Sequence, residues 1–316
     1  MEKQIEKRTD DNQNQIKGIL ITLLAGTLWG FSGTCSQFLF QDYGITPLYL
    51  TNVRMLASGV ILLLIALVKH RSSLISLIKN RKSMIRLFTF SIMGIFFNQF
   101  SYLQAISYTN SGTATILQYV GPVLIMVVSC VTVKRLPNKK ELLSIILVVI
   151  GTWLLATHGD FTSLYITPMG LFWGLLSALA VVFYTMLPVS LIQEYGSIPV
   201  VGFGMLIGGV LLSLTNRFHG GPISYSGRYL IYLAIIIILG TVIPYTSYLL
   251  GVHLCGAVKA SMVASIEPVS ATVCMVAWLG EKFYAIDFIG FLCIFITVFL
   301  LASSEQKIPK SNDSID

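Results

Sequence analysis

Charged residues are scarce in this sequence. Of 316 residues, 11% are Asp, Glu, Lys or Arg, whereas 55% are hydrophobic and the mean hydropathy is +0.79. A soluble globular domain carries about 25% charged residues, so this chain has too little polar surface to face water on all sides. A lipid bilayer is the solvent that suits this composition. The net charge of +7 does not indicate nucleic-acid binding, because the basic residues sit in short gaps between apolar runs.

The sequence also lacks the motifs of several enzyme classes. It contains no HExxH, GxSxG or P-loop motif and no acidic cluster that would hold a metal ion. The four histidines are widely spaced, so neither a metal site nor a cofactor is expected. The five cysteines form no CxxC pair and are expected to be small buried hydrophobic residues. A membrane-embedded enzyme is thus an alternative function that no motif supports. A channel is a second alternative, but no segment of the sequence resembles a selectivity filter.

Long apolar runs fill most of the chain. A helix needs about 20 apolar residues to span a bilayer, and these runs are too long for barrel strands and lack their period-two alternation. The sequence therefore predicts an all-α membrane protein with ten transmembrane helices. The predicted helices cover residues 18–40, 47–68, 85–107, 110–133, 140–157, 168–192, 198–216, 229–252, 256–279 and 283–302.

The distribution of Lys and Arg predicts the orientation of these helices. With the N-terminus in the cytoplasm, 17 of these residues lie on the inner side and three on the outer side. Because cytoplasmic loops carry an excess of Lys and Arg, both termini and the loop 69–84 are predicted to be cytoplasmic. Residues 1–17 are predicted to be a polar tail rather than a cleaved signal peptide. Residues 303–316 are predicted to be a disordered tail. The protein is expected to lie in the cell membrane.

The two halves of the chain resemble each other. QDYGITP at 41–47 matches QEYGSIP at 193–199, an offset of 152 residues. Each half, 18–157 and 168–302, holds five predicted helices, an odd number, so the halves are expected to cross the membrane in opposite orientations. Many secondary transporters have such inverted repeats, with a site near the midplane. Further matches, at an offset of 146, pair Gly94 with Gly240, Tyr102 with Tyr248 and Pro122 with Pro268.

Pro122 and Pro268 are predicted to break two helices at matching depths. Each lies about eleven residues into its helix, which is roughly 16 Å along the helix axis and near the bilayer centre. Proline removes a backbone donor, so the carbonyls of Gln118 and Ala264 are expected to need other partners. A tolerated kink is the alternative interpretation of either proline alone.

Three charged residues stand inside or near the predicted apolar spans, and one of them, Lys259, lies one turn from the cytoplasmic end of the ninth helix, where its side chain is expected to snorkel. Arg54 lies in the second helix and Glu267 lies in the ninth, directly before Pro268. A charge at the membrane centre costs about 3 kcal/mol or more unless it is paired or hydrated. Arg54 and Glu267 lie within roughly one helical turn of each other in height, so they either form a structural ion pair or belong to a substrate or proton site. Both interpretations remain open from the sequence.

Polar and aromatic residues at the same depth complete a candidate site. Individually they are explained by hydrogen bonds between helices. Together they have the mostly aromatic, partly polar character of a small-molecule site. The predicted substrate-binding residues are Trp29, Asn98, Gln99, Tyr102, Gln118, Tyr119, Tyr184, Tyr245 and Tyr248, with Arg54 and Glu267 as electrostatic or coupling residues.

The run SIEPVSATVCMVAWLGEKFYAIDFIG at 265–290 resembles the closing signature of EamA-type transporters. In that signature a proline-containing ninth helix ends in Gly-Glu, here Gly280-Glu281, and the first half has Lys134-Arg135 instead. Arg54 resembles the arginine of the family's second helix. The resemblance covers residues 18–302 and places the chain in the drug/metabolite transporter (DMT) superfamily.

This resemblance implies a ten-helix transporter of amino acids, related metabolites or amphipathic drugs. We therefore predict secondary transport by alternating access, with export as the expected direction, and no enzymatic activity. A lipid flippase of the same fold is the alternative function. The expected partners are a small-molecule substrate, the bilayer, protons as a candidate coupling ion and a second copy in a homodimer, with no nucleic acid.

Overall fold

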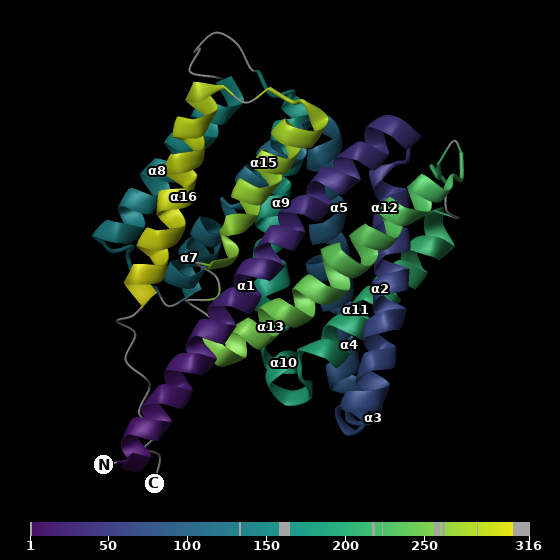
Figure 1. The fold of residues 1–316 in the computed structure, drawn as a ribbon, viewed down its shortest axis with the longest axis vertical. Helices are drawn as coiled ribbons and strands as arrows, with labels where there is room; N and C mark the ends of the chain where they lie inside the picture. Colours follow the sequence, from purple (N-terminus) through teal and green to yellow (C-terminus); the bar gives the residue numbers. More distant parts are fainter. Residues whose placement is uncertain are drawn as a thin grey trace.

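The computed structural model describes residues 2–132, 134–157, 165–216, 219–222, 224–255, 260, 263–282 and 284–305. The described residues form helices and no strands, as expected from the apolar runs. Figure 1 shows the helices side by side, with successive long helices running in alternating directions. Seven helical stretches within these residues are long and apolar enough to cross a membrane.

The first half of the chain begins with one long helix. Its helices are α1 (Glu2–Tyr43), α2 (Pro47–Lys69), α3 (Arg71–Lys79), α4 (Arg81–Thr89), η1 (Phe90–Phe96, a π-helix), α5 (Phe97–Tyr108), α6 (Ser111–Gln118), α7 (Gly121–Thr132) and α8 (Lys139–Thr157). α1 is continuous from Glu2, so residues 2–17 of the predicted polar tail are helical. The predicted loop 69–84 holds a helix of its own, α3, which the search for long apolar runs missed.

The second half has a similar order of elements. It contains α9 (Pro168–Met186), α10 (Val189–Tyr195), α11 (Ser197–Asn216), α12 (Gly227–Ile237), η2 (Ile238–Val242, a π-helix), α13 (Ile243–Cys255), α15 (Ile266–Leu279) and α16 (Ala285–Glu305). The predicted helix 168–192 is interrupted before Val189, where Pro188 cannot continue the backbone ladder. The predicted helix 256–279 begins outside the described residues, and most of the tail 303–316 also lies outside them.

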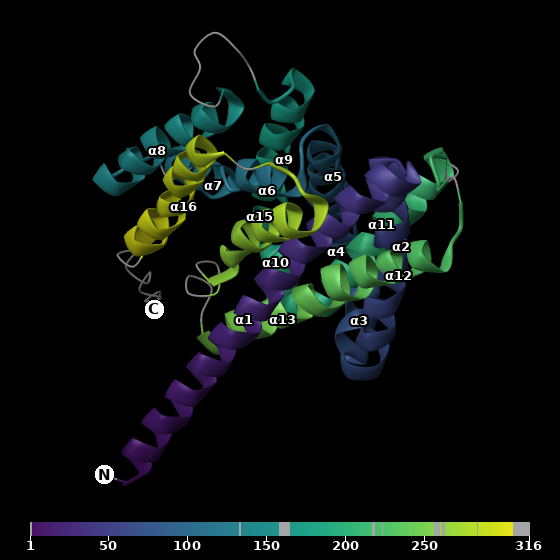
Figure 2. The same ribbon diagram turned by 45° about the horizontal axis from the view of Figure 1, so that its top comes forward.

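Helix contacts pair elements from the two halves. α1 packs along α13 and α15, while α9 packs along α5, α6 and α7. α2 lies against α11, and α8 lies against α16, as both views show (Figures 1 and 2). Glycines permit the closest crossings, because a Cβ at Gly151 of α8 would lie 2.7 Å from the backbone oxygen of Gly290 in α16.

Apolar side chains occur both inside and outside this bundle. Three clusters of buried residues form its core, and the largest buried side chains include Tyr229, Phe90 and Leu39. Many large apolar side chains are nevertheless exposed on the outward faces, such as Leu64, Val149 and Leu230. A soluble protein rarely exposes so much apolar surface, whereas lipid tails cover it in a membrane. All five cysteines are free thiols; Cys35, Cys130 and Cys255 are buried, as expected, whereas Cys274 and Cys293 are only partly buried.

Candidate functional site

The two prolines that were predicted to break helices stand next to interruptions. α6 ends at Gln118 and α7 begins at Gly121, so Pro122 is the second residue of a new helix. α15 begins at Ile266 after a turn at Ser265, and Pro268 is its third residue. Proline is tolerated in a first turn because the N–H that it lacks would have no intrahelical partner there. Both interruptions expose backbone groups at the predicted membrane depth.

Tyr119 lies at the point where the two interruptions meet. Its hydroxyl lies 3.1 Å from the carbonyl oxygen of Ala264, one of the two carbonyls that the prolines were expected to free. The same hydroxyl lies 3.4 Å from Oε2 of Glu267. A tyrosine carries one hydroxyl proton and therefore donates to one of these acceptors at a time. Protonation of Glu267 would let the carboxyl donate to Tyr119 while Tyr119 donates to Ala264.

Small residues of α1 allow this close approach. A Cβ at Gly26 would lie 2.8 Å from the carbonyl oxygen of Ala264, and a Cβ at Gly30 would lie 2.5 Å from that of Glu267. Both contacts involve backbone atoms, which cannot move aside as a flexible side chain can. The glycine spacing in GTLWGFSG at 26–33 is a sequence signal for this close helix contact.

Arg54 is buried and has partners other than Glu267. Its Nε donates to the Thr241 hydroxyl at 2.6 Å, and its Nη2 donates to the carbonyl of Gly240 at 2.8 Å. Both partners belong to the π-helix η2, whose wider turns leave carbonyls without their usual helical donor. The ion pair found among the described residues joins Arg135 and Glu141, so Arg54 and Glu267 do not pair directly. They remain close enough to interact electrostatically.

Four predicted aromatic residues form one contiguous cluster. The ring of Trp29 lies 5.4 Å from that of Tyr245 and 5.5 Å from that of Tyr248, measured between centroids. Tyr184 lies 6.1 Å from Tyr245 in an edge-to-face arrangement. These distances are those of interacting aromatic pairs. α1, α9 and α13 thus bring together aromatic side chains from the two halves of the chain.

Tyr102 contacts the first of the two interrupted helices. Its hydroxyl makes a 2.7 Å hydrogen bond with Thr115 of α6. Tyr248, which matches Tyr102 in the other half, belongs to the aromatic cluster instead, where it packs on Trp29.

The remaining predicted residues have different surroundings. Gln118 donates to Asn98 at 3.3 Å, so these two amides bond to each other. Gln99 is 5% exposed, and neither its oxygen nor its nitrogen has a hydrogen-bond partner. An unsatisfied buried amide is costly, and Gln99 is the residue of this set whose side-chain amide has unused hydrogen-bonding capacity.

The sequence analysis missed a second polar cluster at one end of α1. Gln37 donates to Oε1 of Glu281 at 2.9 Å and accepts the backbone N–H of Ser111 at 2.8 Å, where α6 begins. Gln41 also donates to Glu281, at 3.3 Å. α1 is therefore bonded to α6 and to the segment after α15 by one polar cluster, which we call the α1-end cluster and define as Gln37, Gln41, Ser111 and Glu281.

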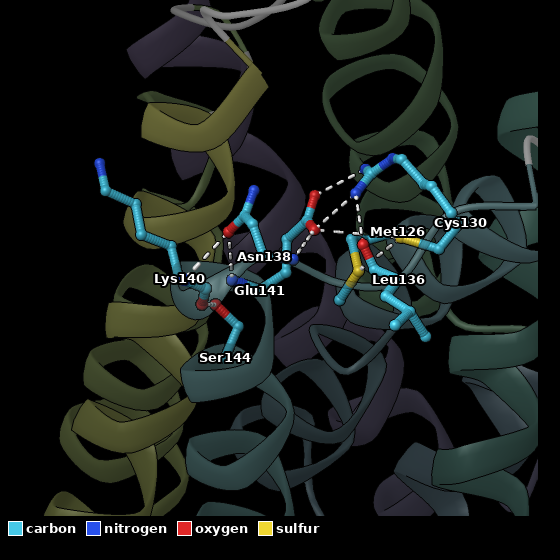
Figure 3. A network of polar contacts seen from close by, with 8 residues as sticks. Met126, Cys130, Leu136, Asn138, Lys140, Glu141 and Ser144 are labelled. Carbon is cyan, nitrogen blue, oxygen red and sulfur yellow. Dashed lines mark hydrogen bonds and ion pairs between the residues drawn. The ribbon is translucent and has the colours of Figure 1, made fainter.

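An ion pair closes the corner between α7 and α8 (Figure 3). Both terminal nitrogens of Arg135 bond to Glu141 at 2.7 Å, and this hydrogen bonding raises the pKa of Arg135 above its ordinary value. Glu141 also accepts the backbone N–H of Asn138 at 2.7 Å. The corresponding corner after α15 has Glu281 in place of Arg135, while the backbone N–H of Tyr284 donates to Asp287.

No cluster of three metal-ligating side chains occurs among the residues that the structure describes. What the centre offers instead is the Glu267 carboxyl group, the Arg54 guanidinium group and several aromatic rings. Such groups bind an organic molecule through hydrogen bonds, charge and ring contacts. Fold and centre together define a polytopic membrane protein with a polar, aromatic centre between its helices.

Comparison with known proteins identifies the family. The model of the EamA-like transporter family matches residues 16–157 and again residues 168–303. The uncharacterized inner membrane transporter YicL of Salmonella typhimurium is 35% identical over 92% of this chain and 97% of its own length. The uncharacterized transporter YetK of Bacillus subtilis is 26% identical over 69% of this chain and 67% of its own. The chain belongs to the EamA-like transporter family, within the DMT superfamily.

A solved structure shows the same fold. One crystal structure of a protein superposes with a TM-score of 0.61 over 95% of this chain and 99% of its own, at 14% identity. Family membership and the apolar helices make this a multi-pass membrane protein of a transporter family.

Proposed function

We propose that the protein is a secondary transporter of small organic metabolites, working by alternating access around the central cluster. The observation that carries this proposal is the meeting of two helix interruptions at Tyr119 and Glu267, next to aromatic residues from both halves. Irregular backbone at membrane depth is tolerated beside protein or a cavity, and discontinuous helices commonly form transporter sites. Glu267 has no ion-pair partner among the described residues and is the candidate proton carrier.

Ten helices in two inverted repeats are part of this proposal. Features at an offset of 146 residues support it, since the π-helices η1 and η2 contain Gly94 and Gly240, and the interruptions fall at Tyr119 and Ser265. Helix contacts support it too. α1 packs on α13 and α15 as α9 packs on α5, α6 and α7. A shared order of π-segments, breaks and contacts is hard to explain without a common five-helix unit.

The α1-end cluster suggests how one end of the protein is sealed. In the proposed orientation, Gln37 and Glu281 lie at the outer ends of α1 and α15, where they join helices from both halves. Four aromatic residues reinforce this end, as Trp278 contacts Phe31, Phe38 and Tyr232 with centroids 5.4–6.0 Å apart. The inner equivalents differ: Val189 stands in place of Gln37, and Arg135 bonds within its own corner. We infer an outer gate that is closed in this conformation.

Cross-linking the outer gate is expected to stop transport. In a protein without native cysteines, Gln41→Cys and Glu281→Cys would be joined by a short, reductant-cleavable thiol reagent. Substrate release to the outer side requires these helices to separate, so transport should fall to background and return after reduction. Arg135→Cys with Glu141→Cys, a contact inside one half, is the control and should transport equally before and after cross-linking. Full transport by the cross-linked gate pair would refute the gate.

The proposed orientation is tested by labelling in intact cells. A cysteine introduced at Ser76 of α3 should resist an impermeant thiol reagent until the cells are lysed, because the excess of Lys and Arg puts this segment in the cytoplasm. Labelling of Ser76→Cys without lysis would reverse the assignment of both termini.

The transport activity itself is tested with purified protein in sealed proteoliposomes. Labelled amino acids and related metabolites form the first substrate panel, with a pH gradient as the driving force. Uptake without ATP is expected, since the sequence contains no P-loop. Strict ATP dependence would contradict secondary transport, and movement of labelled phospholipid with no soluble solute would favour the flippase alternative.

A further inference from the structure

A short helical hairpin between α2 and α5 carries a concentrated positive charge. No Asp or Glu occurs from residue 69 to residue 86. We call this segment the basic hairpin, and its six basic side chains are all exposed. None of them forms an ion pair with any residue that the structure describes. They are Lys69 at the end of α2, Arg71 and Lys79 of α3, and Arg81, Lys82 and Arg86 of α4.

The hairpin also exposes apolar side chains beside these charges. α3 has nine residues, about 14 Å of helix, and is too short to span a bilayer. Leu74 and Leu77 face the core, at 5% and 0% exposure, while Ile75 and Ile78 point outward at 41% and 51%. α4 likewise exposes Phe88. A short helix that docks one apolar face and exposes a second, next to cations, is typical of the membrane interface.

Side-chain bonds hold the basic hairpin in place. The Tyr195 hydroxyl, at the end of α10, accepts from Asn80 at 3.2 Å and bonds with Ser83 at 3.0 Å. The oxygen of Asn80 accepts the backbone N–H of Lys82 and Ser83, which caps α4. The backbone of the hairpin is therefore held in place before any ligand binds.

The described residues of the second half show no equivalent of this hairpin. Between the end of α11 at Asn216 and the start of α12 at Gly227, the described residues 219–222 and 224–226 form no helix. The hairpin is thus not required by the five-helix unit. Figure 1 shows α3 at the end of the molecule from which α1 starts. The exposed acid on α10, Glu194, forms no ion pair with the hairpin, so the cations are not neutralised by it.

We propose that the basic hairpin binds the headgroups of anionic phospholipids in the cytoplasmic leaflet, with Ile75, Ile78 and Phe88 in the boundary between headgroups and acyl chains. Clusters of four to eight Lys and Arg residues directly beside a membrane helix attract anionic lipid. The apolar side chains favour a lipid over a soluble anion, because a soluble anion leaves them in water.

The test uses full-length protein in nanodiscs of phosphatidylcholine with increasing phosphatidylglycerol. Phosphatidylglycerol should raise the thermal unfolding midpoint of the wild type, and 0.5 M salt should weaken this effect. The variant Arg71→Gln, Lys79→Gln, Arg81→Gln, Lys82→Gln should keep its midpoint in pure phosphatidylcholine. It should need about tenfold more phosphatidylglycerol for the same rise.

A matched pair of double variants separates the hairpin from general charge. Arg81→Gln with Lys82→Gln removes two adjacent cations at the start of α4, whereas Lys139→Gln with Lys140→Gln removes two at the start of α8. The first should weaken the lipid effect and the second should not. Equal loss in both variants, no loss in the quadruple variant, or equal protection of the wild type by inorganic phosphate would each overturn the proposal. If the quadruple variant does not fold, the two double variants decide.

Discussion

Replacing Glu267 by glutamine is expected to leave the fold intact and to reduce transport at least tenfold, with loss of its pH dependence. Glutamine has the shape of glutamate and can still bond to Tyr119, whose hydroxyl lies 3.4 Å from the Glu267 carboxyl. It cannot carry a charge or exchange a proton. Because Arg54 is bonded to Gly240 and Thr241, loss of the Glu267 charge leaves no broken ion pair behind.

The measurement is uptake by proteoliposomes between about pH 5 and 8, together with the thermal unfolding midpoint of the purified variant. Glu194→Gln, an exposed acid on α10, is the control and should transport like the wild type at every pH. A well-folded Glu267→Gln protein with unchanged transport across this range would remove Glu267 from the mechanism. The unsatisfied amide of Gln99 and the aromatic residues would then be the remaining candidates for substrate binding.

Adding a single methyl group at Gly30 is expected to destabilise the protein strongly. In Gly30→Ala the new Cβ would lie 2.5 Å from the Glu267 carbonyl oxygen and 2.6 Å from the Ala271 nitrogen. Both are backbone atoms, so α1 and α15 must separate. Overpacking of this kind costs about 1–3 kcal/mol. Separation would also displace Glu267 from Tyr119, so the folded fraction should transport poorly.

Gly227→Ala is the matched control for this substitution. Gly227 is the first residue of α12, and a Cβ there meets nothing within 4 Å. Alanine should therefore be neutral or slightly stabilising, since it lowers the entropy of the unfolded chain. Both variants would be compared by detergent-solubilised yield and thermal unfolding midpoint. Equal behaviour of the two would show that α1 and α15 do not pack as closely as these distances require.

Much of the helical arrangement was predictable from the sequence because the bilayer imposes a length and a composition on each helix. Runs such as 47–68 and 140–157 differ from α2 and α8 by a single residue at the ends. α3 was not predictable in the same way. Its four apolar side chains are too few for a spanning helix, and its cations resemble those of an ordinary cytoplasmic loop.

The chemistry of the centre was predictable in kind but not in its pairings. Proline chemistry indicated that the Ala264 carbonyl would need a partner, but nothing local indicated that Tyr119 would supply it. The sequence did not decide whether Arg54 and Glu267 form an ion pair. In the structure, Arg54 instead donates to the Gly240 carbonyl of the π-helix η2. A π-helix has wider turns than an α-helix and no amino-acid composition that marks it. Its free carbonyls therefore cannot be predicted before the backbone is known.

Lys134 and Gly280, which match at the offset of 146 residues, both have a left-handed backbone. The φ of Lys134 is 54°, which is uncommon for a residue with a side chain, and the φ of Gly280 is 68°. The two corners thus share a left-handed residue and differ in charge, with Arg135 after one and Glu281 after the other. In the proposed inverted arrangement, these corners face opposite compartments. The basic corner would then help retain its loop in the cytoplasm during insertion, while the acidic corner is free to cross. The two halves would be interchangeable as folded units but not as nascent chains.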